Sequence, residues 1–205
     1  MKYFIDTEFI EGFHKPLFGK RRHFIDLISI GVVCEDGRSY YAISTDFKAK
    51  DASDWVKKNV IAKLPDRYAS FSDPGTSPRS RKEAMQWKPT KVIVTELLDF
   101  FGCWRDQHFW RAPKGIEVYG YYADYDWVLF CSLLGTMMDL PKQFPMYCRD
   151  LKQMFDEKFD LSMHEVIKGA MYYPKQQDEH NALADAEWNK RLYDFITEEK
   201  IYLTK

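Results

Sequence analysis

Strand-like runs of apolar residues occupy the first part of the chain. The segment from Phe4 to Phe9 consists of strand-forming residues with two acids placed two positions apart, and Phe24 to Glu35 and Ser39 to Ser44 are two further runs. Between the last two runs, Asp36-Gly37 is a residue pair typical of a tight turn. The pattern therefore predicts three strands joined as an antiparallel meander.

Helical spacing replaces this pattern after the third run. Between Trp55 and Leu64 the apolar residues recur on one stripe, and Ser53 or Asp54 can cap a helix that Pro65 ends. The segment from Lys91 to Phe101 has the apolar side of a second helix. These two helices would connect the meander to the second half of the chain.

The second half alternates short strand and helix patterns. We expect a fourth strand over Ile116 to Tyr121, parallel to the first because a helical crossover separates them, and an apolar helix over Trp127 to Leu134. Met146 to Asp156 predicts a short strand or turn followed by a helix, and Met163 to Ala170 continues the helical layer. A last helix opens near His180 and runs through Ile196. The predicted class is α/β, with a mixed sheet of meander and parallel strands flanked by helices.

Two stretches have no regular pattern. Residues Glu11 to His23 indicate a hairpin loop with a basic tip, Lys20 to His23. Pro65 to Pro89 predicts a long loop insertion rich in Ser, Pro, Gly, Arg and Lys. Its Arg79 and Arg81 could meet a phosphate backbone, or the whole stretch could be an ordinary solvated loop.

Composition narrows the class of protein. A chain of 205 residues fits one domain, which we expect to span residues 1–205, and can bury a sizeable core without disulfides. The net charge of −1 argues against a protein that coats nucleic acid by bulk electrostatics, although a local basic patch can still hold a phosphate backbone. The four cysteines are scattered, which disfavours structural zinc. Without a leader pattern or a membrane-length apolar run, we expect a cytoplasmic protein and no membrane partner.

Asp6 and Glu8 are the first candidates for chemistry. In a strand, residues two positions apart share a face, so these two like charges would lie side by side. A folded chain keeps such a pair near its core only with compensation, and Mg²⁺ or Mn²⁺ is a natural compensator for carboxylate oxygens. Alternatively, the pair could belong to a strand with one face in solvent.

Three later residues can join this pair. Asp126 follows the predicted fourth strand at a strand-to-helix junction, Asp185 lies in the first turns of the last helix, and His180 precedes it by five residues. Taken alone, each could be a helix cap or a surface residue. Taken in this order, βαβ topology can bring all of them to one point, which predicts a single anionic site.

This constellation resembles the DEDDh exonucleases. Their motifs are Asp-x-Glu on the first strand, an Asp at a strand-helix junction and His-x-x-x-x-Asp on a late helix, which Asp6, Glu8, Asp126, His180 and Asp185 match. The sister DEDDy group has a tyrosine four residues before the last aspartate, where this chain has asparagine. The histidine therefore indicates the DEDDh subgroup.

Within that group the chain is most similar to the polyadenylate-specific exoribonuclease AS family. The similarity is carried by Tyr3 to Glu11, Leu27 to Val33 and Ala123-x-Tyr125-Asp126, and it extends from Met1 to about Ile196. The chain departs from this family in the basic cluster at residues 20–23 and in the long loop at 65–89. These departures leave its substrate preference open.

The resemblance implies a ribonuclease-H-like fold and a 3′-5′ exoribonuclease that shortens RNA with a free 3′ end, favouring adenylate tracts. It also implies two Mg²⁺ ions, for which Mn²⁺ may substitute. In our assignment Asp6 binds both ions, Glu8 and Asp185 complete the site that activates water, and Asp126 holds the other ion. His180 would deprotonate the attacking water, because imidazole titrates near neutral pH.

Substrate contacts are harder to assign. Phe9 and Tyr122 are candidates for stacking on the terminal nucleotide, although Phe9 could equally be a core residue. Family members are often dimers, and the aromatic segment Trp104 to Trp110 could contribute to a homodimer or to the core.

Three alternative functions stay open at this point. One is a DNA exonuclease that uses the same five residues. Another is an inactive nucleic-acid-binding module, for which we would expect one of the five to be replaced. The last is a scaffold in which the acids coincide by chance.

Overall fold

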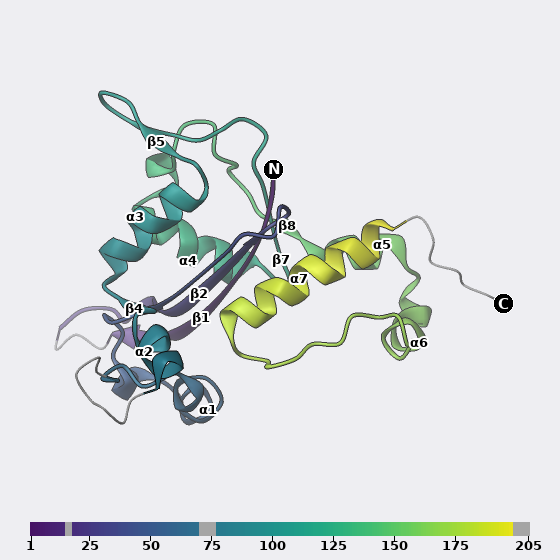
Figure 1. Ribbon diagram of the computed structural model, residues 1–205, viewed down its shortest axis with the longest axis horizontal. Coiled ribbons are helices and arrows are strands. Elements are labelled where there is room, and N and C mark those ends of the chain that lie inside the picture. Colours follow the sequence, from purple (N-terminus) through teal and green to yellow (C-terminus); the bar gives the residue numbers. More distant parts are fainter. Residues whose placement is uncertain (15–17, 70–76, 199–205) are drawn as a thin grey trace.

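The computed structural model describes residues 1–14, 18–69 and 77–198 (Figure 1). Its strands are β1 (Lys2–His14), β2 (Arg22–Cys34), β3 (Ser39–Ser44), β4 (Trp87–Lys88), β5 (Trp104–Arg105), β6 (Trp110–Arg111), β7 (Glu117–Gly120) and β8 (Arg149–Asp150). Its α-helices are α1 (Asp54–Asn59), α2 (Pro78–Ala84), α3 (Thr90–Phe100), α4 (Asp124–Leu134), α5 (Leu151–Lys158), α6 (His164–Lys168) and α7 (Ala182–Thr197). Within these ranges, every helix is too short or too polar to cross a lipid bilayer.

One mixed sheet organises the described part of the chain. Its strand order is β4-β3-β2-β1-β7-β8, and β5 and β6 form a separate hairpin. Strands β1, β2 and β3 pair antiparallel, whereas β7 runs parallel to β1 and β8 runs parallel to β7. The predicted meander, the predicted parallel pairing of the first and fourth strands and the α/β class are therefore confirmed.

Helices cover both faces of this sheet because β1 is apolar on both of its sides. Tyr3 and Ile5 point into a core shared with α3 and α4, whereas Phe4 points into a second core shared with α5 and α7 (Figure 1). Asp6 and Glu8 follow Phe4 by two and four positions. They therefore lie on the face of β1 that α7 covers.

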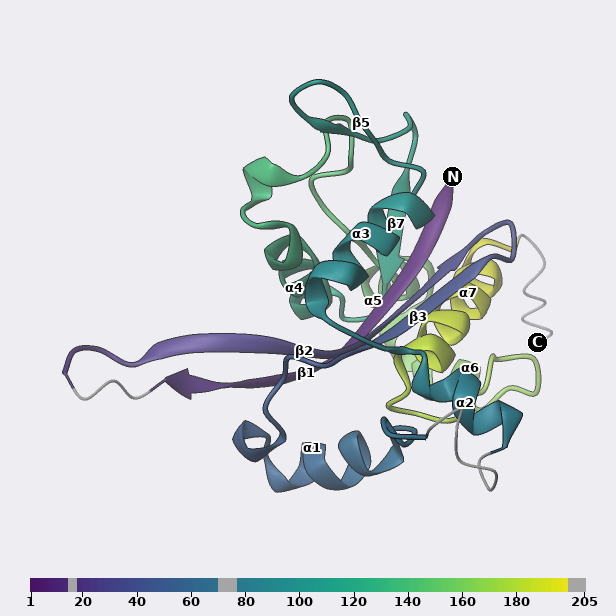
Figure 2. The ribbon, with the colours of Figure 1, turned by 60° about the vertical axis from the view of Figure 1, so that its left-hand side comes forward.

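Strands β1 and β2 extend further than the sequence predicted. The segment after Glu11 was expected to be a loop, but the two strands remain paired as far as His14 and project as a two-stranded ribbon (Figure 2). Cross-strand contacts favour this extension, since the ring of Phe13 packs edge-on against that of its partner His23 with centroids 5.4 Å apart. Residues 15–17 of the expected loop lie outside the described part.

The sequence predicts a long loop at residues 65–89, but the structure has a helix and a short strand within this stretch. Ser77 caps helix α2, and β4 adds to the edge of the sheet beside β3. The indole N–H of Trp87 donates to the carbonyl of Pro65 at 3.0 Å and joins the two ends of the stretch. Residues 70–76 lie outside the described part.

The first predicted helix is shorter than expected. Ser53 caps α1 as predicted, by accepting a hydrogen bond from the N–H of Val56 at 3.2 Å. The helix ends at Asn59, however, and continues as a 3₁₀ turn over Ile61–Lys63. The predicted apolar stripe still reaches the core, because Val60 is buried and packs with Val56, Ile61 and Leu64.

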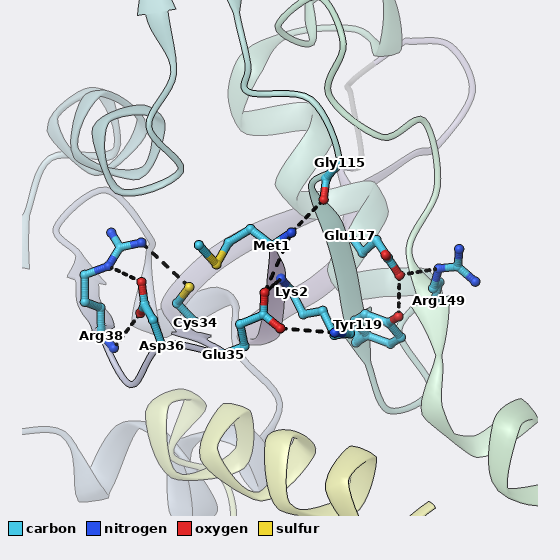
Figure 3. Close-up of polar contacts among 10 residues, drawn as sticks. All are labelled: Met1, Lys2, Cys34, Glu35, Asp36, Arg38, Gly115, Glu117, Tyr119 and Arg149. Carbon is cyan, nitrogen blue, oxygen red and sulfur yellow. Dashed lines mark hydrogen bonds and ion pairs between the residues drawn. The ribbon is translucent and has the colours of Figure 1, made fainter. Parts of the chain in front are cut away.

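Polar contacts fasten the end of β1 that lies opposite the ribbon (Figure 3). The amino group of Met1 donates to the carbonyl of Gly115 at 2.7 Å, and the Lys2 ammonium lies 3.1 Å from the carboxylate of Glu35. These contacts join the start of β1 to the loop before β7 and to the turn after β2. They fix the register of the strand that carries Asp6 and Glu8.

Helix α7 packs closely against β1 and β2. A Cβ atom on Gly31 of β2 would lie 2.2 Å from the carbonyl oxygen of Ala182, so this approach needs glycine. The buried side-chain amide of Asn189 donates to the carbonyl of Ile5 at 2.9 Å. Together these contacts set the first turns of α7 beside the acidic pair of β1.

Candidate active site

Three carboxylates meet where β1 faces the start of α7. Asp6 and Glu8 come from the strand, and Asp185 comes from the first turn of the helix. One carboxylate oxygen from each of the three residues lies within 4.8 Å of the others. The structure therefore brings these three sequence-predicted residues into a group that is compact enough to share a cation.

The start of α7 orients Asp185 through local hydrogen bonds. Asn181 caps the helix, with its side-chain oxygen accepting from two backbone N–H groups of the first turn. His180 adopts a positive φ of 67°, and its backbone N–H donates to one oxygen of Asp185 at 2.9 Å. The side chain of Gln176 donates to the other oxygen at 2.6 Å. No sequence motif indicated Gln176, because its role depends on how the preceding loop folds.

Asp126 approaches the same site from the other side of β1. It was predicted at a strand-to-helix junction and lies in the first turn of α4, where Ala123 holds the N-cap position. Its Oδ1 accepts hydrogen bonds from the backbone N–H of Thr7 at 2.8 Å and from the Thr7 hydroxyl at 2.5 Å. Thr7, which lies between the two acids of β1, therefore ties Asp126 to their strand.

The acids of the site raise one another's pKa values. Burial, followed by the negative charges of Asp126, Asp185 and Glu8, raises the pKa of Asp6 well above its ordinary range. Burial and the charges of Asp185 and Asp126 raise the pKa of Glu8 to about 8, although Lys63 acts against this shift. Burial also raises the pKa of Asp126 to about 6 and raises that of Asp185. The site therefore has an excess of negative charge.

This charge and this donor set fit a hard divalent cation. Carboxylate oxygens are the ligands that Mg²⁺ and Mn²⁺ prefer, and the close group of Asp6, Glu8 and Asp185 supplies three of them. A bound cation would favour the ionised form of each acid and so reverse the cause of the raised pKa values. The residues present therefore fit a metal centre.

His180 lies beside the group of acids, and residues outside the sheet contact it and the residue before it. Its ring meets that of Trp55 on α1 edge-on, with centroids 4.8 Å apart. The side-chain ammonium of Lys63 donates to the carbonyl of Glu179 at 3.0 Å, one residue before the histidine. The sequence analysis had placed Trp55 on the apolar stripe of a helix, but the residue is 55% exposed and lines the site.

All five predicted residues line one cavity of about 560 Å³. Phe9 also lines it and stacks on Tyr125, with ring centroids 5.8 Å apart and planes 8° apart. Tyr122 lines it with a positive φ of 53° and a side chain that is 63% exposed. The cavity thus offers aromatic rings next to the acids, and Tyr125 is a ring that sequence reasoning did not single out for binding.

Arg79 and Arg81 are not among the residues that line this cavity. Both lie on α2, where the guanidinium of Arg79 forms a salt bridge with Glu83 one helical turn away, at 2.7 Å. Their predicted contact with a phosphate backbone would have to occur beyond the cavity.

Comparison with known proteins gives a family for this fold and site. Residues 1–197 match the family described as "3'-5' exoribonuclease Rv2179c-like domain". The chain is 34% identical over 197 residues to the 3'-5' exoribonuclease Rv2179c of Mycobacterium tuberculosis strain H37Rv, a match that covers 96% of this chain and 94% of that protein. The same identity and coverage hold for the 3'-5' exoribonuclease MT2234.1 of M. tuberculosis strain CDC 1551. With its acids and histidine around one cavity and a match over nearly its whole length, the chain belongs to the Rv2179c-like 3'-5' exoribonuclease domain family.

Proposed function

We propose that this protein removes nucleotides one at a time from the 3′ end of single-stranded RNA by two-metal-ion hydrolysis, with a preference for adenylate tracts. The observation that carries the proposal is the meeting of Asp6, Glu8 and Asp185 within 4.8 Å, with Asp126 and His180 lining the same cavity. Family membership supports the direction of cleavage and the class of substrate.

The acids would hold the cations. Asp6, Glu8 and Asp185 would hold one ion, and Asp126 together with Asp6 would hold the second. When bound, two Mg²⁺ ions neutralise the phosphodiester, activate a water molecule and stabilise the leaving oxygen. Because one oxygen of Asp126 already accepts two hydrogen bonds from Thr7, this residue has less capacity for an ion than the other three acids.

His180 would act as the general base. As the water oxygen attacks phosphorus and the bond to the 3′ oxygen of the preceding nucleotide breaks, one imidazole nitrogen accepts a proton from the water. The edge-on contact with Trp55 and the hydrogen bond from Lys63 to Glu179 restrict where this ring can lie. Both contacts would therefore contribute to catalysis by positioning the base.

Aromatic rings would hold the end of the RNA. The Phe9–Tyr125 stack and the exposed ring of Tyr122 lie in the cavity beside the acids. Stacking on such rings contributes about 1–3 kcal/mol per base and accepts any base. The preference for adenylate rests on the likeness to the polyadenylate-specific family at Tyr3 to Glu11 and Ala123 to Asp126.

One assay tests the activity, its direction and its substrate together. RNA oligomers of adenylate and of uridylate and a DNA oligomer of adenylate, all labelled at the 5′ end, are incubated with enzyme and Mg²⁺. We expect a ladder that shortens from the 3′ end, fastest for adenylate RNA, and no cleavage of a circular RNA. Faster loss of the DNA oligomer would favour the DNA exonuclease instead.

The proposal also covers the choice of metal ion, the oligomeric state and the location of the enzyme. We expect Mn²⁺ to replace Mg²⁺, because both ions prefer oxygen ligands. The exposed rings of Trp104 and Phe109 on the hairpin of β5 and β6 are available for contact with a second copy of the chain in a homodimer. We also expect the protein in the cytoplasm, with the RNA it degrades.

A further inference from the structure

The ribbon formed by the outer parts of β1 and β2 leaves the rest of the fold beyond its base. At the base, Ile10 and Phe24 pack with Val56 and Val60; the strands then continue to His14 and Arg22 and project away from the helices (Figure 2). A two-stranded ribbon is marginally stable by itself, so its extension calls for a functional explanation.

One face of the ribbon continues from the active-site cavity. Residues of a strand alternate between its faces, so Phe9, Glu11 and Phe13 share one face of β1. A second cavity of about 530 Å³ lies along this face and is lined by Glu11, Gly12, Phe13, His23 and Tyr125. Glu11 and Tyr125 also line the active-site cavity, so the two cavities adjoin.

The charge of the ribbon fits a polyanion. Lys20, Arg21 and Arg22 are all exposed, whereas Glu11 is the one acid between Glu11 and Phe24. Its carboxylate lies 3.5 Å from the imidazole of His23, the residue that pairs with Phe13. Cations therefore outnumber acids on an arm of a protein whose net charge is −1.

Exposed rings accompany these cations. Phe13 is 56% exposed and Phe18 is 88% exposed, so both rings are accessible to a ligand. Aromatic rings combined with a basic track are the features that bind single-stranded nucleic acid without sequence preference.

We propose that the ribbon is an RNA-binding arm that holds the substrate on the 5′ side of the nucleotide being removed. This inference rests on the proposed exoribonuclease function and adds a second contact region to it. The strand would leave the acids past Phe9 and Tyr125 and run along the Phe13 face. Its phosphates would meet the exposed cations Lys20 and Arg21, which precede the Arg22 end of β2.

The length of the arm sets the length of RNA that can use it. From Asp6 to His14, at about 3.3 Å per residue, β1 spans about 26 Å. That distance corresponds to at most about eight stacked nucleotides at about 3.4 Å each. A trimer would therefore reach the acids without reaching the basic end, whereas a 16-mer would occupy both.

The test compares two substrate lengths in arm variants. Lys20→Gln with Arg21→Gln removes two exposed cations, and Phe13→Ala removes an exposed ring together with its contact to His23. The control is Lys114→Gln with Arg191→Gln, which are also exposed; Lys114 precedes Gly115, at the opposite end of β1 (Figure 3), and Arg191 lies on α7. Each variant hydrolyses an adenylate trimer and an adenylate 16-mer at several salt concentrations.

For the arm variants we expect KM on the 16-mer to rise by about tenfold, with kcat on the 16-mer and both constants on the trimer unchanged. In the variant that lacks Lys20 and Arg21, the slope of log binding constant against log salt should shrink by about 1.4, since each lost phosphate contact removes about 0.7 for a single strand. The control variant should behave as wild type.

Two outcomes would contradict the proposal that the ribbon binds RNA. One is equal kinetics of wild type and arm variants on the 16-mer. The other is a change of sedimentation from dimer to monomer in the arm variants without a length-dependent KM, which would assign the ribbon to a second copy of this chain. If the wild-type protein instead leaves both RNAs intact, the proposed function itself has failed.

Discussion

At the scale of single residues, the acids of the site oppose the folding of the metal-free chain. Asp6, Glu8 and Asp185 bring like charges within 4.8 Å, and burial makes the ionised form of each more costly. The same arrangement would make the folded protein a ligand for divalent cations. Stability and metal binding should therefore respond in opposite directions when one acid is removed.

Replacing Glu8 by glutamine tests this opposition. We expect the metal-free variant to melt at a higher temperature than wild type, because one buried like charge is gone. We also expect millimolar Mg²⁺ to raise its melting temperature less, since a ligand is lost, and turnover to vanish. Differential scanning fluorimetry with EDTA and with Mg²⁺ measures both shifts. A variant that gains from Mg²⁺ as much as wild type would remove Glu8 from the metal site.

Replacing His180 by alanine separates the base from the cations. The rate should fall on the order of 10²–10⁴-fold, the usual contribution of a positioned general base. The stabilisation by Mg²⁺ should persist, because the three clustered acids remain. His108→Ala, on the loop between β5 and β6, is the matched control and should keep the wild-type rate. An unchanged rate in the His180 variant near neutral pH would contradict the base role.

The acids also predict how stability depends on pH. In the folded metal-free protein the pKa of Glu8 is about 8 and that of Asp126 about 6, above their ordinary values of 4.5 and 3.8. Between the ordinary and the raised values the folded state binds more protons than the unfolded state. The resulting stability is therefore complete below pH 4 and is lost as the pH rises through 6 and 8.

Urea unfolding in EDTA from pH 5 to pH 8.5 measures this loss. With saturating Mg²⁺ the dependence should flatten, because the cations compete with protons for the same oxygens. A metal-free stability that increases across this range would contradict the raised pKa values of Glu8 and Asp126.

At the scale of elements, the distance between α7 and β2 decides whether the acids meet. A Cβ atom on Gly31 would lie 2.2 Å from the carbonyl oxygen of Ala182, so Gly31→Ala should push the start of α7 away from β1. We expect a loss of about 1–3 kcal/mol of stability from this overpacking and a large loss of activity. Gly169→Ala is the control, since its nearest neighbour would be 3.3 Å away. Urea unfolding measures the loss of stability, and the RNA assay measures the loss of activity. A Gly31→Ala variant with wild-type activity would show that α7 can shift its position without harm to the site.

Elements with a strong local pattern could be predicted from sequence, and elements that depend on distant partners could not. The alternating apolar faces of β1 and the capped helices gave correct strands, meander and layers. The sequence predicts a loop where the ribbon lies, because the pairing of the ribbon depends on contacts across the strands, such as Phe13 with His23. Helix α2 was missed because a stretch rich in Ser, Pro and Gly has no helical stripe.

The residues of the candidate active site also fall into two groups: those that a sequence pattern predicts, and those that depend on distant partners. Asp6, Glu8, Asp126, His180 and Asp185 could be predicted because their spacing follows the topology of a βαβ fold, and all five line one cavity. Thr7, Gln176 and Trp55 act through contacts with residues far along the chain or in a folded loop, which no local pattern records.

At the scale of the whole molecule, fold and family agree on the class of enzyme. The mixed sheet flanked by helices confirms the predicted fold class, and family membership confirms the prediction of a 3′-5′ exoribonuclease. The relation to the polyadenylate-specific family, the two-ion count and the homodimer stay predictions. These three predictions concern how the active site of the family is adapted in this protein to a substrate or a partner.

The proposed general base and the proposed cation ligands are held by different parts of this molecule. The acids project from β1, α4 and α7, whereas His180 is restrained by Trp55 and Lys63, which lie on a short segment outside the sheet. We therefore expect a change at Trp55 to affect turnover more than the ion requirement, whereas a change at Lys63, whose charge acts on Glu8, should affect both. Redesign around Trp55 therefore offers a way to change the rate of the enzyme while the proposed metal ligands stay in place.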